Sequence, residues 1–234
     1  MTTAVATRTV GTPWLAATAI VLSFAAGATD AFAFLRLGGI FTANMTGNLV
    51  LIGLTERPGY LNTLFGAIVA VLVFAATVYV AHRIARPGDG LRRGLIIVLA
   101  ATLLAQIAVL IGWIVNPQPL QLAIQGLLIA FSAIAMAGQT SVSKRVEKHS
   151  GVTTTFVTGT ITSLMGDFAD RTPQDRGIRI GVIFALTTGA LSGSLLIGVN
   201  PTFGAALPLV PSLIGLVLIT RMPPAASAAR KEAL

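Results

Sequence analysis

Polar side chains interrupt an apolar stretch at residues 42–48, where the sequence reads TANMTGN. Hydrocarbon penalises such groups unless they find hydrogen-bond partners, so the cluster marks either a binding site or a close helix contact. Asn44 and Asn48 are four residues apart, which places both amides on one face of a helix. Thr46 adds a hydroxyl, and Gly47 lets a backbone or a solute come close. We therefore predict a constriction that selects a solute or an ion; the alternative is helix packing.

A second, weaker cluster follows 112 residues later, at residues 154–160, where the sequence reads TTFVTGT. It repeats the spacing of two threonines and a glycine in the first cluster. The candidate site residues of this half are Thr155, Thr158, Gly159 and Thr160. Threonines are weaker evidence than asparagines, because a threonine hydroxyl can bond back to its own helix. The two matching clusters predict two segments that face each other at the functional centre of the molecule.

Asp30 is the acidic residue that falls within a predicted membrane span. A carboxylate at that depth is costly, and it indicates proton coupling or cation binding. Two structural roles compete with this one: Asp30 pairs with Arg36, or it caps the start of the segment that carries the first cluster. Gln139 stands before the second cluster much as Asp30 stands before the first, so it joins the candidate binding residues. Gln106 and Gln125 are further polar residues within spans.

The sequence contains little that supports catalysis or metal binding. It has no cysteine, and its two histidines stand at span ends without a second ligand nearby. No Ser-His-Asp arrangement, phosphate-binding loop or zinc-ligand spacing is present in the sequence. We therefore expect a protein that is not an enzyme and that needs no cofactor and no metal.

The composition is that of a protein with many membrane spans. Hydrophobic residues make up 54% of the 234 positions, charged residues make up 10%, and the mean hydropathy is +0.84. This leaves no room for a separate soluble domain, so the expected environment is a lipid bilayer. The net charge of +8 does not indicate nucleic acid, because the lysines and arginines stand between apolar runs rather than in one patch. They are typical of topology signals.

Eight apolar segments follow one another along the chain. They are residues 13–35, 38–54, 61–84, 94–115, 120–142, 151–168, 178–199 and 202–219. The second and sixth carry the two clusters; both are short, interrupted by polar residues, and barely able to cross a core of about 30 Å. Short interrupted segments in matching halves are typical of transporter binding sites. The predicted fold is all-α and integral to the membrane, with six transmembrane helices plus two short re-entrant or broken helical segments.

Charge counting supports this topology. If both short segments re-enter, 14 of the 16 Lys and Arg residues lie on one side and only Arg36 and Arg57 on the other, as the positive-inside rule requires. A spanning second segment with an outside N-terminus gives the same split, so the charges test the sixth segment and not the second. The basic connections change sides between the two halves. This change predicts an inverted 3+3 repeat.

The predicted organisation has four parts. Residues 1–12 form a cytoplasmic N-terminal tail, residues 13–115 the first repeat, residues 116–220 the second repeat, and residues 221–234 a cytoplasmic C-terminal tail. Both termini are therefore expected in the cytoplasm.

Several stretches of the sequence resemble a known family. The run from Gly27 to Ala31 (GATDA), the run from Gly38 to Asn48 (GGIFTANMTGN) and residues 153–159 resemble the YoaK-like family of bacterial membrane proteins. The resemblance covers nearly the whole chain. It implies a multi-pass protein of the bacterial inner membrane with six spans, of a kind sometimes labelled a permease. It implies no substrate.

Two functions are consistent with these residues. The leading one is a transporter or channel for a small solute or ion, with a polar centre built from the two Thr-Gly segments and with proton coupling through Asp30. The alternative is a membrane partner or scaffold protein that transports nothing and uses the clusters for helix packing. The expected partners are the bilayer and an unidentified solute or ion, nucleic acid is not expected, and assembly into a homo-oligomer is left open.

Overall fold

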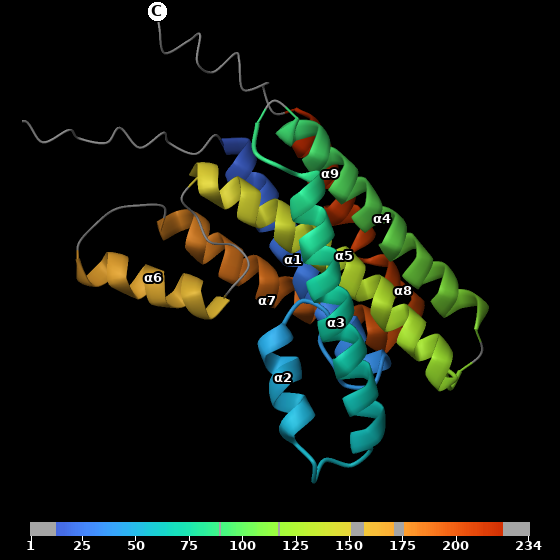
Figure 1. Ribbon diagram of the computed structural model, residues 1–234. Coiled ribbons are helices and arrows are strands. Elements are labelled where there is room, and N and C mark those ends of the chain that lie inside the picture. Colours follow the sequence, from blue (N-terminus) through green and yellow to red (C-terminus); the bar gives the residue numbers. More distant parts are fainter. Residues whose placement is uncertain (1–12, 89, 117, 151–156, 171–175, 222–234) are drawn as a thin grey trace, which may run out of the picture.

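The computed structural model describes residues 13–88, 90–116, 118–150, 157–170 and 176–221, and all regular structure in these ranges is helical. Nine helices follow one another in this part of the chain (Figure 1). They are α1 (Pro13–Arg36), α2 (Met45–Gly53), α3 (Tyr60–Ile84), α4 (Leu91–Val115), α5 (Leu122–Ser150), α6 (Val157–Ala169), α7 (Arg176–Val199), α8 (Pro201–Ala206) and α9 (Leu209–Thr220). The all-α fold predicted from the sequence is confirmed.

Six stretches of the described chain are long and apolar enough to cross a membrane. Five belong to the single helices α1, α3, α4, α5 and α7, and the sixth joins α8 to α9 over Pro201–Thr220. α2 has 9 residues and α6 has 13, so at 1.5 Å per residue they extend about 14 and about 20 Å, less than a core of about 30 Å. The predicted combination of six spans and two short helices is therefore confirmed for the described residues.

The second predicted segment, residues 38–54, is helical only over α2. Residues 37–44 lie outside any helix. Gly38 and Gly39 have φ of +95° and +70°, a left-handed conformation that stops α1 and turns the chain. The segment therefore enters as irregular chain and leaves as a short helix.

The last predicted segment, residues 202–219, is broken into α8 and α9. Pro208 stands at the N-cap of α9, where it has no N–H to donate to the preceding turn. The N–H of Ser212 then resumes the helical pattern by donating to the carbonyl of Pro208 at 3.2 Å. This span thus contains two helices, with an interruption at residues 207–208.

α1 and α7 touch through their backbones. A Cβ added to Gly27 of α1 would lie 2.0 Å from the carbonyl oxygen of Leu186, and one added to Gly189 of α7 would lie 2.1 Å from that of Phe24. Gly193 continues the same seam one turn further along α7. Small residues permit such close approach between membrane helices, where packing rather than hydrophobicity drives association. α1, which carries Asp30, is therefore held firmly.

The other spans pack around this pair. α3 packs on α5, where a Cβ added to Gly126 would lie 2.8 Å from the ring of Phe65. α4 packs on α5 and α9, α1 packs on α9, and the short helices α2 and α6 pack on α3 and α7. α1 begins and α9 ends at the same end of the bundle, the upper end in Figure 1, as an even number of spans requires.

Candidate functional site

A glycine turn sends the chain back along α1 after that helix ends. A Cβ added to Gly38 would lie 2.2 Å from Nε2 of Gln125, and one added to Gly39 would lie 2.3 Å from the guanidinium of Arg57. The Thr63 hydroxyl donates to the Gly38 carbonyl at 3.3 Å, and Nη1 of Arg57 donates to the Gly39 carbonyl at 3.2 Å. The positive φ values favour glycine at both positions. The two hydrogen bonds hold the turn against α3, through Thr63, and against the connection that precedes α3, through Arg57.

Asp30 binds the chain just before α2. Its Oδ1 accepts hydrogen bonds from the backbone N–H groups of Thr42 at 2.7 Å and Ala43 at 2.8 Å, and from the Thr42 hydroxyl at 3.4 Å. Within the described residues it forms no ion pair with Arg36. Capping is therefore the structural role that Asp30 has. It stands six residues before the end of α1, so α2 starts about 9 Å inward of that end.

The N-terminus of α2 thus points inward and meets a carboxylate. The first turn of a helix carries a positive partial charge, which a carboxylate bound just before the helix offsets. The N–H groups that Asp30 binds, those of Thr42 and Ala43, precede the N-cap Asn44, and Asn44 itself accepts from the Gly47 N–H of the first turn. Hydrogen bonds to a charged acceptor contribute about 1.5–3 kcal/mol each. The Asp30 side chain is partly exposed. An anionic solute would find this helix end already neutralised.

Asn48 uses its whole amide on the backbone of Phe41. Its Oδ1 accepts from the Phe41 N–H at 2.9 Å, its Nδ2 donates to the Phe41 carbonyl at 2.6 Å, and the side chain is fully buried. Asn44 precedes the helix as its exposed N-cap, where Oδ1 accepts from the Gly47 N–H at 3.2 Å. The predicted shared helical face of the two amides is wrong, because Asn44 lies outside the helix. Thr46 is exposed, and Gly47 packs against the Phe41 ring.

The second cluster is described only from the first residue of α6 onward. Thr155 lies outside the described residues. Thr158 is exposed, Gly159 is partly buried and Thr160 is fully buried. The Thr158 carbonyl accepts a hydrogen bond from the Thr162 hydroxyl at 2.9 Å, which is the back-bonding within one helix that threonines favour.

α2 and α6 do not form a packed pair. α2 packs on α3, whereas α6 packs on α7 and lies to one side of the bundle (Figure 1). Asp167 of α6 forms an ion pair with Arg179 of α7 at 3.4 Å, and the guanidinium of Arg176 lies 4.5 Å from the ring centre of Phe168. These contacts fasten α6 to α7. The predicted meeting of the two clusters at the centre is therefore wrong for the described residues.

Gln139 connects α5 to α9 rather than to α6. Its Nε2 donates to the Ser212 hydroxyl oxygen at 2.8 Å. Its Oε1 is buried and accepts no hydrogen bond from the described part of the chain. The residue thus belongs to a polar contact in the interior, but the partner is the last span.

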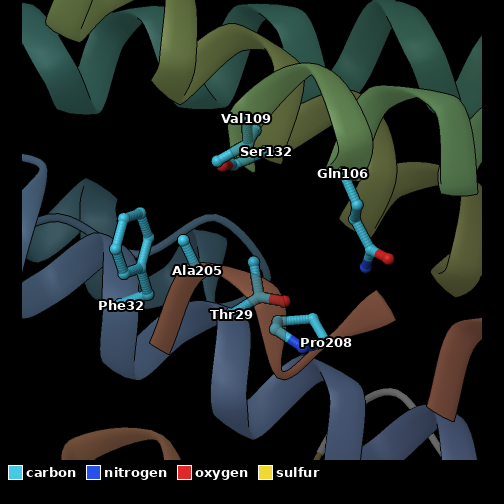
Figure 2. A pocket seen from close by; sticks show the side chains of 7 residues that line it. All are labelled: Thr29, Phe32, Gln106, Val109, Ser132, Ala205 and Pro208. Atoms are coloured by element: carbon cyan, nitrogen blue, oxygen red, sulfur yellow. The ribbon is translucent and has the colours of Figure 1, made fainter. Parts of the chain in front are cut away.

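A small cavity lies between α1, α4, α5 and the break between α8 and α9. It is lined by Thr29, Phe32, Gln106, Val109, Ser132, Ala205 and Pro208. The space open to the centre of a water-sized sphere is about 10 Å³, which suits about one water molecule. Figure 2 shows Gln106 descending from α4 and Thr29 rising from α1 toward the same space, with Ser132 of α5 beside Val109.

Polar atoms around this cavity lack partners. Both amide atoms of Gln106 and the hydroxyl of Ser132 are buried, with no hydrogen bond to any described residue, and the two side chains are 3% and 1% exposed. The Thr29 hydroxyl donates to the Ala25 carbonyl at 2.8 Å and keeps its acceptor capacity. A buried polar group without a partner costs about 1–3 kcal/mol, so a polar molecule bound here would stabilise the fold.

Neither Gln106 nor Ser132 is among the site residues predicted from the sequence. One signal in the sequence does point to Ser132. Gln125, Ser132 and Gln139 stand at intervals of seven residues on α5. That spacing places them along one face of the helix over about 21 Å. A polar line of this length inside a membrane span is the feature that leads to the cavity.

Comparison with known proteins gives a family but no solved structure. The family described as "Protein of unknown function (DUF1275)" matches residues 18–220. The chain is also similar to the UPF0700 transmembrane protein YoaK of Bacillus subtilis (strain 168), with 30% identity over 154 residues. That match covers 64% of this chain and 66% of the relative, just under two thirds of its length. No solved structure matches the chain.

Proposed function

The chain belongs to the DUF1275 family, which confirms its resemblance to the YoaK-like transmembrane proteins, and from this premise we propose that it is a transporter or channel for a small polar solute. The small cavity lined by Thr29, Gln106 and Ser132, which we call the central cavity, carries this proposal. Three polar atoms of Gln106 and Ser132 are buried there without partners among the described residues. Apolar side chains would give a more stable core at these positions, so a polar lining is best explained by a polar occupant.

The position of the cavity supports the same function. α1 and α4 belong to the first half of the chain, and α5 and the α8–α9 span belong to the second half. Transporters with repeated halves hold their solute between the halves, where interrupted helices expose backbone groups. Pro208, at the interruption of the last span, lines the cavity.

Two observations support the proposed inverted 3+3 repeat. In such a repeat α1 corresponds to α5, α2 to α6, α3 to α7, and α4 to the α8–α9 span. Each packed pair of helices then has a packed counterpart: α1–α7 corresponds to α5–α3, α4–α5 to α9–α1, and α2–α3 to α6–α7. In addition, Ser23 and Asp30 on α1 repeat the seven-residue spacing of Ser132 and Gln139 on α5. The acid of the first half then corresponds to an amide in the second half.

The protonation of Asp30 distinguishes two versions of this proposal, a proton-coupled transporter and a passive channel. In a proton-coupled transporter, a proton on Asp30 removes the charge that strengthens its hydrogen bonds to Thr42 and Ala43, so the N-terminus of α2 is held less firmly. The proton would then change the position of α2. In a passive channel, Asp30 stays ionised as a cap and α2 stays in place.

A second candidate, the non-transporting scaffold, is favoured by one observation. Asp30, Asn44 and Asn48 all use their hydrogen-bonding groups on the backbone of residues 41–47. The first cluster therefore shapes the chain and offers little to a solute. A scaffold and a transporter differ in the central cavity, which a scaffold does not need.

Filling the cavity separates the two functions. Ala205 lines the cavity, so Ala205→Leu places three more carbon atoms in a space that suits about one water molecule. Ala101 of α4 is exposed on the outside of the bundle, and Ala101→Leu is the matched control. In proteoliposomes tested against a panel of small polar solutes, we expect protein-dependent flux that Ala205→Leu removes and Ala101→Leu retains. Flux that survives in a folded Ala205→Leu variant, or no flux above protein-free liposomes, would overturn the proposal.

A further inference from the structure

We infer that the central cavity selects a small neutral solute that both donates and accepts hydrogen bonds, with Gln106 as the recognising side chain and Ser132 as its second contact. This solute class rests on the proposed function and makes it specific. The atoms without partners point to it. Gln106 offers an N–H donor and a carbonyl acceptor at the end of one side chain, and the Ser132 hydroxyl can act as either.

The cavity offers nothing that would compensate a charge. None of the described residues that line it is ionisable. Asp30 follows the lining residue Thr29 in sequence, but its Oδ1 is engaged by the N–H groups of Thr42 and Ala43. An ion in this space would lose its hydration without gaining a counter-charge, which is a large penalty in a low dielectric. A hard cation also needs about six oxygen ligands, more than Thr29, Gln106 and Ser132 supply together.

A carboxamide is matched by a molecule that carries a donor and an acceptor on neighbouring groups. Urea and acetamide can form two parallel hydrogen bonds with Gln106 and still reach a hydroxyl such as that of Ser132. Water shares the same chemistry, and a cavity of about 10 Å³ has the size of one water molecule. An amide therefore needs a wider cavity than this one, whereas water fits without movement.

The polar line on α5 extends this chemistry beyond the cavity. Gln139, whose Oε1 is buried without a partner in the described chain, stands seven residues from Ser132, or about 10 Å along the helix. Gln125 stands at the same interval in the other direction, beside the Gly38 turn. Two neutral amides, with the Ser132 hydroxyl between them, thus follow one another along the span.

Solute pairs that differ in charge but not in shape test this selection. Urea and guanidinium are nearly the same size, as are acetamide and acetate. Proteoliposomes with wild-type protein are compared by stopped-flow light scattering and tracer uptake for these four solutes and for water. The variants are Gln106→Leu and Gln106→Glu. The controls are Gln121→Leu and Gln121→Glu, because Gln121 is exposed just before α5.

For wild type we expect urea, acetamide or water to cross about tenfold faster than in protein-free liposomes, with guanidinium and acetate near the background. Gln106→Leu should lower the neutral flux about tenfold, since the paired hydrogen bonds are lost. Gln106→Glu should turn the preference from urea toward guanidinium, which a merely structural role of Gln106 would not produce. The Gln121 variants should behave as wild type. Water flux alone, lost in Gln106→Leu, supports the same chemistry with water as the solute.

Two results overturn the inference and remain distinct from failure of the proposed function. Wild-type flux of guanidinium or acetate equal to that of urea or acetamide would remove the neutral selectivity while leaving a transporter. Neutral flux unchanged in folded Gln106→Leu protein would remove Gln106 as the recognising residue, and Ala205→Leu would still report on the cavity. Failure of the proposed function itself appears as no protein-dependent flux of any of these solutes or of the wider panel.

Discussion

Asn48→Ala tests the role of the first polar cluster most directly. The substitution leaves the N–H and the carbonyl of Phe41 without the partners that now lie at 2.9 and 2.6 Å. A buried group without a partner costs about 1–3 kcal/mol, and because Phe41 is only partly buried we take about 1–2 kcal/mol for each. The expected loss of unfolding free energy is about 2–4 kcal/mol. For a chain of this size, that lowers the unfolding temperature by about 4–16 °C.

The assay is thermal unfolding in detergent, followed by the fluorescence of the two tryptophans. Asn44→Ala is the matched control, because Asn44 is an exposed cap that accepts one hydrogen bond at 3.2 Å from Gly47, a contribution of about 0.5–2 kcal/mol. Asn48→Asp should also be destabilised, since it keeps the acceptor for the Phe41 N–H but loses the donor to the Phe41 carbonyl. An Asn48→Ala shift no larger than that of Asn44→Ala would refute the structural role of Asn48.

Two further pairs of substitutions test how α2 and α7 are held against α1. Asp30→Asn keeps an acceptor oxygen for the N–H of Thr42, so it should unfold at a higher temperature than Asp30→Ala; equal unfolding temperatures would contradict the cap. Gly189→Ala places a methyl group 2.1 Å from the Phe24 carbonyl and should cost about 1–3 kcal/mol. Gly198→Ala on the same helix meets open space and should be neutral or stabilising by up to about 1 kcal/mol. Equal unfolding temperatures for the two alanine variants would rule out backbone contact between α1 and α7.

The membrane spans could be predicted because hydrocarbon imposes a simple requirement on sequence. A span must be apolar over about 20 residues, and the predicted segment 61–84 accordingly matches α3 within one residue. The short second segment was harder to place. Its helix is confined to α2 because residues 37–44 form the Gly38–Gly39 turn and the irregular chain that binds Asp30. Composition alone does not distinguish irregular chain from helix in an apolar stretch.

The candidate site depended on contacts that a single sequence does not contain. The cavity combines Gln106 of α4 with Ser132 of α5 and Thr29 of α1, and nothing in the order of residues tells which helices lie together. Ser132 also resembles the many serines that bond back to their own helix, as Ser141 does to the Ala137 carbonyl at 2.8 Å. Asn48 was conspicuous in the sequence, but its partner Phe41 is apolar in type and offers only its backbone.

The partnership of α1 with α7 has a consequence for how the chain is made. Gly27 and Gly189, which bring the two helices into contact, are 162 residues apart. At about 5–20 residues per second, a ribosome needs roughly 8–30 s to reach the second after the first, and α1 meanwhile lies in lipid without its neighbour. The hydrogen-bond partner of Asp30 is made sooner, because Thr42 follows after 12 residues, in about 1–2 s. The carboxylate can thus be covered by its own nascent chain during insertion, well before α7 leaves the ribosome.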